Sequence, residues 1–209
     1  MTDVKAMLLA VADTMDAHRD ALCKLDGVIG DADHGVAMQG GFKAVREALL
    51  ALDGGTPTEL FNTAAKAFLN AVGASSGPLY ATALMRAGAA VKGKEALEDA
   101  DAAVIIAAMA EGIAHRGKAS VGDKTMYDAW APAAEAAADV AGQGFAAVMA
   151  AAAEAAEVGA EATVLMQAKL GRAARLGARS VGHCDPGAAS AALMLAAMAG
   201  SVLGAVSDQ

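Results

Sequence analysis

The chain has 209 residues, of which 56% are hydrophobic and 3% aromatic, and 16 basic against 24 acidic residues give it a net charge of −8. That acidic balance argues against binding to nucleic acid or to an anionic membrane surface, and the N-terminus lacks the basic and apolar regions of a secretory signal. Cys23 and Cys184 show no CxxC spacing, so we expect neither a disulfide framework nor a zinc site. From the length and these features together we expect one soluble, cytoplasmic domain that spans residues 1–209.

Apolar residues recur at helical spacing along most of the chain, and no stretch alternates convincingly with a period of two. The scarcity of aromatic residues favours a core of small and aliphatic side chains, in which helices pack closely. One predicted helix, from Phe145 to about Leu176, contains Gly159, and a glycine inside a helix lowers its stability by about 1 kcal/mol relative to alanine. We therefore predict an all-α protein with helices at Thr2–Leu25, Val36–Leu50, Thr58–Ala71, Leu79–Val91, Ala100–Arg116, Met126–Val140, Phe145 to about Leu176 and Gly187 to about Ala205.

The segments between these helices alternate in character. The second, fourth and sixth connections, "ALDGGTP", "KGKEALED" and "AGQG", look like plain linkers, whereas the other four are rich in glycine and polar residues. Successive helices joined by short connections pack antiparallel, so the odd-numbered connections fall at the same end of a bundle. The sequence therefore predicts an antiparallel eight-helix bundle with a functional site at one end.

The first connection, "DGVIGDADHG", carries Asp26, Asp31 and Asp33 among glycines. Three converging carboxylates repel one another unless a cation neutralises them, and an all-oxygen set suits Mg²⁺ or Ca²⁺. The EF-hand spacing fails because Phe42 stands where the closing glutamate would be, which favours Mg²⁺ accompanied by the phosphates of a nucleotide. The alternative is that these aspartates only cap the helix from Val36 and lie in water.

The other three polar connections each lead into a helix N-terminus, where free backbone N–H groups attract anions. Pro78 fits the first turn after "GASSGP", and the hydroxyls of Ser75 and Ser76 are suited to hold a phosphate. The segment Gly112–Ser120 nearly matches a P-loop. It is rejected because Ala119 replaces the required hydroxyl residue and no strand precedes it.

Helix capping alone explains several of these polar residues. Thr125 and Asp128 form a pair like a capping box, and Asp185 with Pro186 fits an N-cap followed by the first helical residue. His34 suits a phosphate hydrogen bond as well as a packing role. Four such connections at one end, one of them acidic, nevertheless indicate a nucleotide pocket.

Four segments in order, "LDGVIGDADHG", "GASSGPLYATALMRAG", "GDKTMYDAW" and "KLGRAARLGARSVGHCDPGAASAALML", resemble the nucleotide-binding domain family of dihydroxyacetone kinases, which includes the ADP-binding subunits of the bacterial enzymes. The resemblance implies an antiparallel eight-helix barrel with the nucleotide at one end. It implies that Asp26, Asp31 and Asp33 hold two Mg²⁺ ions that bridge the phosphates of ADP or ATP. The positions that it implies to lie at the nucleotide are His34, Gly35, Val36, Ala37, Ser75, Ser76, Gly117, Thr125, Met126, Arg179, Asp185, Pro186 and Gly187.

The resemblance further implies a kinase subunit that transfers a phosphoryl group to dihydroxyacetone held on a separate kinase subunit. His34 resembles the phosphotransferase-linked type, in which ADP stays bound as a coenzyme and is recharged by a phospho-histidine protein. Val36, Ala37 and Gly40 lack side chains usual in the family, so an ATP-dependent subunit acting on a four-carbon ketose such as erythrulose is the alternative. A homodimer is compatible with either type.

Two functions of other classes use the same residue types. A nucleotide-dependent regulatory module would share the pocket and need no turnover. A helical enzyme of Mg²⁺-dependent isoprenoid chemistry also clusters aspartates, but it lines its pocket with aromatic side chains, and four Phe, two Tyr and one Trp are too few. With no general base evident, the chain's expected contribution to phosphoryl transfer is positioning and charge neutralisation.

Overall fold

The computed structural model of the chain describes residues 2–73 and 76–207. These residues form nine α-helices and three 3₁₀ helices without a named strand, although Thr2 and Leu97 form an isolated bridge. The all-α prediction is confirmed. The elements are α1 Val4–Ala17, α2 Arg19–Ile29, α3 His34–Leu50, α4 Pro57–Ala71, α5 Ser76–Ala90, α6 Asp101–Gly117, α7 Tyr127–Asp139, η1 Ala141–Gln143, α8 Phe145–Ala162, η2 Thr163–Leu165, η3 Ala173–Ser180 and α9 Pro186–Ser207.

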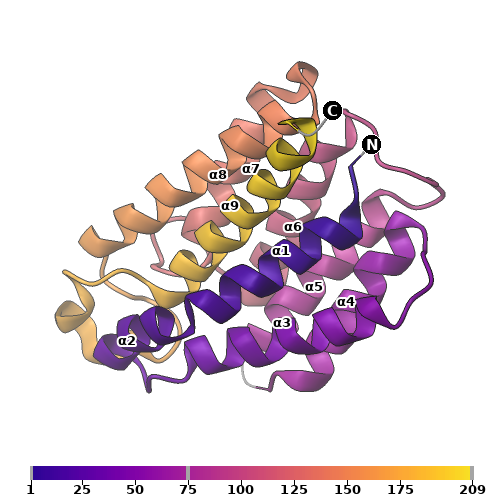
Figure 1. The fold of residues 1–209 in the computed structure, drawn as a ribbon. Helices are drawn as coiled ribbons and strands as arrows, with labels where there is room; N and C mark the ends of the chain where they lie inside the picture. The colour runs from indigo at the N-terminus through magenta and orange to yellow at the C-terminus, as the bar shows by residue number, and fades with distance from the viewer. Residues whose placement is uncertain (1, 74–75, 208–209) are drawn as a thin grey trace.

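The eight longer helices pack against one another in a closed order. Each of α3 to α8 contacts the next helix along the chain, and α1 contacts both α3 and α9. Figure 1 shows α1 beginning, and α9 ending, at the same end of the bundle, while α2 lies at the opposite end. Packing of sequence neighbours explains this order, because short connections leave each helix beside the one before it.

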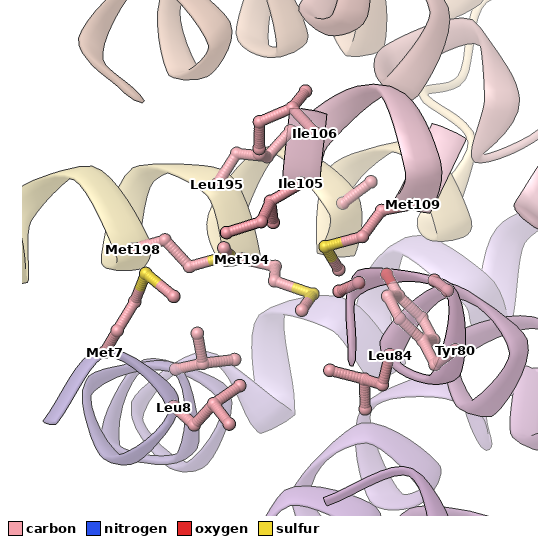
Figure 2. Close-up of a cluster of buried hydrophobic side chains, with 14 of the residues drawn as sticks. Met7, Leu8, Tyr80, Leu84, Ile105, Ile106, Met109, Met194, Leu195 and Met198 are labelled. Atoms are coloured by element: carbon pink, nitrogen blue, oxygen red, sulfur yellow. The ribbon is translucent and has the colours of Figure 1, made fainter. Parts of the chain in front are cut away.

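A single cluster of buried apolar side chains fills the interior, with contributions from all the α-helices. Figure 2 shows methionines, leucines and isoleucines of α1, α5, α6 and α9 meeting there: Met7, Leu8, Leu84, Ile105, Ile106, Met109, Met194, Leu195 and Met198. By length and composition alone, Pro186–Gly204 of α9 could cross a membrane, with a mean hydropathy of 1.6. In the structure α9 packs against α1, α7 and α8, so its apolar side chains contribute to the core of the bundle.

The predicted helix Thr2–Leu25 is wrong as a single element, because it breaks at His18 into α1 and α2. At the break, His18 donates its backbone N–H and turns its ring Nδ1 to the same acceptor, the carbonyl of Thr14. The apolar spacing continues across the break, with Leu22 and Ile29 of α2 buried, so periodicity does not reveal it. The predicted count of eight helices is therefore not confirmed, since the described residues contain nine.

The predicted helix from Phe145 to about Leu176 is also too long. Gly159 does lie inside α8, where a Cβ would come within 2.2 Å of the Asp128 backbone oxygen of α7. The α-helix ends at Ala162 and tightens into η2, where the Thr163 hydroxyl donates to the Ala160 carbonyl and accepts from the Asp185 N–H. Residues 163–185, which we call the strap, then run through η2 and η3 back to α9.

Candidate functional site

A cavity of about 460 Å³ lies where the four polar connections meet. It is lined by the first residues of α3, α5 and α9 and by Met126 just before α7. Residues 170–173 of the strap line it as well. Figure 1 shows that α2, which ends in this cavity, lies opposite both termini. The sequence prediction that the first, third, fifth and seventh connections share one end of the bundle is confirmed.

The three aspartates of the first connection meet at the cavity wall. Asp26 is buried in the last turn of α2, whereas Asp31 and Asp33 are exposed on the loop that follows. One carboxylate oxygen from each lies within 4.8 Å of the other two. Between the two exposed aspartates, Ala32 adopts a positive φ of 62°, a strained conformation for a residue with a Cβ. The loop thus accepts backbone strain where its two carboxylates converge.

Asp26 also carries the capping role that the sequence left as an alternative. Its Oδ2 accepts hydrogen bonds from the backbone N–H groups of Asp33 at 3.0 Å and His34 at 3.2 Å. A Cβ on Gly30 would lie 2.1 Å from Asp26 Oδ1, so only glycine leaves room for this carboxylate. Capping accounts for Asp26, but Asp31 and Asp33 make no such bonds within the described chain.

Arg172 brings a positive charge from the strap to the acidic cluster. Its guanidinium pairs with Asp31 and lies 3.7 Å from Asp33 Oδ2. An ion pair between exposed groups adds little stability, but it places a positive charge of the strap against the acidic cluster. Arg172 was not among the predicted site residues. Arg179, which the family resemblance places at the nucleotide, is exposed and does not line the cavity, and its role toward a ligand stays a prediction. The basic "KLGRAAR" segment within the seventh connection was the available signal.

A hydrogen-bonded chain leads from the cavity wall into the core. His34 Nε2 lies 2.9 Å from Ser190 Oγ, Tyr80 Oη lies 2.8 Å from the same atom, and Ser190 Oγ donates to the Gly187 carbonyl. When Ser190 gives its one hydroxyl proton to the Gly187 carbonyl, its oxygen is left to accept from the Tyr80 hydroxyl and from the Nε2–H tautomer of His34. Burial lowers the pKa of His34 and raises that of Tyr80, which favours the neutral form of both side chains.

Replacing Ser190 with alanine should destabilise the protein by about 1–3 kcal/mol, because it leaves the buried Tyr80 hydroxyl without an acceptor. Adding Tyr80→Phe to Ser190→Ala removes that unsatisfied hydroxyl and should restore part of the loss. Urea unfolding of both variants measures this. A double variant less stable than Ser190→Ala would contradict the hydrogen-bond assignment.

The remaining predicted site residues divide into two groups. Ser76, Gly117, Thr125, Met126, Asp185, Pro186 and Gly187 line the cavity together with His34. Gly35, Val36 and Ala37 on α3 do not line it, and Ser75 lies outside the described residues. Gly35 instead serves packing, since a Cβ there would come within 1.9 Å of the Arg19 backbone oxygen of α2. Their roles toward a ligand stay predictions.

The N-cap predicted at α9 is confirmed, whereas the capping box predicted at α7 forms only in part, because the N-cap residue of α7 is Met126 and the Asp128 N–H donates to the Thr125 backbone carbonyl. Asp128 Oδ2 accepts from the Thr125 N–H at 2.7 Å, and Thr125 Oγ1 accepts from the Tyr127 N–H at 3.2 Å. Asp185 Oδ2 accepts from the Ala188 N–H at 2.8 Å, and burial raises the pKa of Asp185 to about 7. The N-termini of both helices are thereby fixed at the cavity.

The fold and the cavity define an all-helical protein whose binding pocket joins an acidic cluster to four helix N-termini. A model of the DAK2 domain matches residues 28–200, and the chain belongs to this family.

Relatives of two kinds resemble the chain. The ADP-binding subunit DhaL of the PEP-dependent dihydroxyacetone kinase of Escherichia coli (strain K12) is 37% identical over 200 residues, 95% of each chain. The L-erythrulose 1-kinase of Mycolicibacterium smegmatis is 35% identical over 181 residues, which are 85% of this chain but 31% of that protein. The crystal structure of the dihydroxyacetone kinase from C. freundii in complex with AMP-PNP and Mg²⁺ matches with a TM-score of 0.74 and 25% identity, over 96% of this chain and 34% of that one.

Proposed function

We propose that this chain is the nucleotide-binding subunit of a dihydroxyacetone kinase, which passes a phosphoryl group from its bound nucleotide to dihydroxyacetone held on a partner kinase subunit. The observation that carries the proposal is the meeting of three carboxylates and four helix N-termini at one cavity. The similarity to the E. coli ADP-binding subunit over 95% of each chain supports it.

The residues of the cavity fit a magnesium–nucleotide complex. The cluster of Asp26, Asp31 and Asp33 offers hard, anionic oxygens at the spacing of a shared cation, and two Mg²⁺ ions are part of the proposal. Bound there, Mg²⁺ neutralises charge on the transferring phosphoryl group. The four helix N-termini turn the positive ends of their dipoles to the cavity, which favours the phosphates of a nucleotide there, and Arg172 on the strap supplies a cation beside them. Positioning and charge neutralisation are thus what this chain contributes.

The partner subunit is proposed to cover the mouth of the cavity. Exposed aliphatic side chains lie on the segments that line the cavity: Val28 on α2, Val36 on α3, Val121 before α7, and Leu165, Leu170 and Val181 on the strap. Apolar side chains around a polar pocket are typical of a protein–protein interface. A ketone held on the partner is thereby brought against the nucleotide with water excluded.

The proposed phosphoryl donor is a phospho-histidine protein of the phosphotransferase system that recharges ADP in place. The E. coli relative belongs to a PEP-dependent kinase, and His34 stands in the acidic connection as in the phosphotransferase-linked type. The similarity to L-erythrulose 1-kinase keeps an ATP-dependent ketose kinase as the second candidate. Either function is proposed to operate in the cytoplasm.

An exchange experiment with labelled ADP tests this proposal. The protein is loaded with labelled ADP and Mg²⁺, freed of unbound nucleotide, and mixed with a dihydroxyacetone-binding kinase subunit, ketone and excess unlabelled ATP. We expect the label to stay bound and turnover to begin only when the phospho-histidine donor is added. Rapid loss of label with repeated turnover on ATP would instead establish the ATP-dependent function. Bound nucleotide without turnover under either condition would favour the regulatory module.

A further inference from the structure

Lys124 is a lysine buried to 1% exposure in the connection before α7. It adopts a positive φ of 60°, which is a strained conformation for a residue with a Cβ. A buried ammonium group is costly unless hydrogen bonds or opposite charges satisfy it. The structure thus accepts both a strained backbone and a desolvated cation at this position, which itself lines the cavity, and the function proposed above assigns Lys124 no role.

The ammonium group of Lys124 joins the two ends of the strap. It donates to the backbone carbonyls of Thr163, the first strap residue, and His183, close to its end. The strap ends also bond each other, since the Gly182 N–H donates to the Val164 carbonyl at 2.7 Å and the Asp185 N–H to Thr163 Oγ1 at 2.9 Å. Asp185 and Asp128 lie close enough to attract the Lys124 charge, whose pKa burial lowers.

The part of the strap between these ends lies over the cavity. Leu170, Gly171, Arg172 and Ala173 all line it, and Arg172 reaches the acidic cluster. The strap contacts the connection before α7 once more, where the Lys169 N–H donates to the Asp123 carbonyl at 3.0 Å and Lys169 Nζ lies 3.1 Å from Asp123 Oδ1. The ion pair between Lys169 and Asp123 is on the surface, since the Lys169 side chain is 62% exposed. We therefore expect the buried hydrogen bonds of Lys124 to hold the strap more strongly than the exposed ion pair of Lys169.

We propose that Lys124 is a positioning residue that clamps both ends of the strap, and that this clamp limits how fast a nucleotide leaves the cavity. A ligand under a segment fixed at both ends escapes only when the segment moves, so loss of the clamp acts on dissociation more than on association. The inference rests on the proposed function in one respect, which is that a nucleotide binds in this cavity. It deepens that function, because a slow release is what a retained coenzyme requires.

Three variants test the clamp. Lys124→Met removes the charge and both hydrogen bonds, Lys124→Gln keeps an amide donor in case the methionine variant does not fold, and Lys169→Met removes only the exposed pair as a matched control. Stopped-flow release of a fluorescent ADP analogue with Mg²⁺, chased by unlabelled ADP, gives the dissociation rate. Hydrogen exchange of the nucleotide-free protein reports on the amides of Gly182 and Lys169.

Lys124→Met is expected to release the nucleotide about tenfold faster, with association within about twofold of the wild type and faster exchange at both amides. Lys169→Met should stay within about twofold in release. A Lys124 variant with a lower melting temperature but unchanged release and exchange would overturn the clamp, because a merely structural lysine predicts that pattern. Failure of the wild-type protein to bind Mg-ADP would overturn the proposed function and this inference together, whereas normal binding with unchanged release would overturn the inference alone.

Discussion

Replacing Asp31 or Asp33 with asparagine is expected to weaken the binding of Mg-ADP at least about 100-fold, because a divalent cation needs the anionic oxygens that an amide does not supply. Both side chains are exposed and Arg172 is their ion-pair partner, so the free energy of unfolding should change by less than about 1 kcal/mol. Calorimetric titration with Mg-ADP measures the first effect, and urea unfolding of the nucleotide-free protein measures the second.

Asp20→Asn is the matched control for these variants. Asp20 lies in the first turn of the helix that carries Asp26, is 91% exposed and pairs with Arg19, so its replacement removes an equal charge away from the cluster. We expect its Mg-ADP affinity to stay within about twofold of the wild type. Wild-type affinity in both Asp31→Asn and Asp33→Asn would show that the acidic cluster does not hold the metal.

Gly35→Ala is expected to have the largest effect on stability, a loss of about 3 kcal/mol. An added Cβ would lie 1.9 Å from the Arg19 backbone oxygen and 2.7 Å from Cys23 Sγ, so α2 and α3 must move apart. That movement separates Asp26 from the N-terminus of α3, which it caps. Mg-ADP affinity should therefore fall along with the unfolding free energy, although Gly35 does not line the cavity.

Gly40→Ala separates this packing effect from the general effect of a helical glycine. Gly40 lies in the same helix, and a Cβ added there would have nothing within 4 Å, so alanine should stabilise the protein by about 0.5–1 kcal/mol. Urea unfolding of Gly35→Ala and Gly40→Ala measures the change in unfolding free energy caused by each substitution. Equal stability changes in the two would mean that α2 and α3 do not approach as closely as described.

The local pattern of the sequence determined most of the helices and the end of the bundle at which they present their polar connections. Apolar spacing located α3 to α7 and α9 to within a few residues, since helical burial repeats every three to four residues. Polar and proline residues marked the starts of α7 and α9, because Asp128 and Asp185 accept from nearby backbone N–H groups and Pro186 fits the first helical position, where an N–H would have no partner within the helix. Short connections then fixed which loops share an end.

Only the tertiary structure decided the break at His18, the strap and the contacts that hold it. The break leaves the apolar spacing intact, and α8 stops where the Thr163 hydroxyl meets Asp185, 22 residues further along the chain. The partners of Lys124 lie 39 and 59 residues away, and the partner of His34 lies 156 residues away. Local propensity carries no signal for such pairs, because their energy depends on which segments the folded bundle brings together. The same physical reason explains why Arg172 was not predicted at the acidic cluster, since its position there depends on the path of the strap.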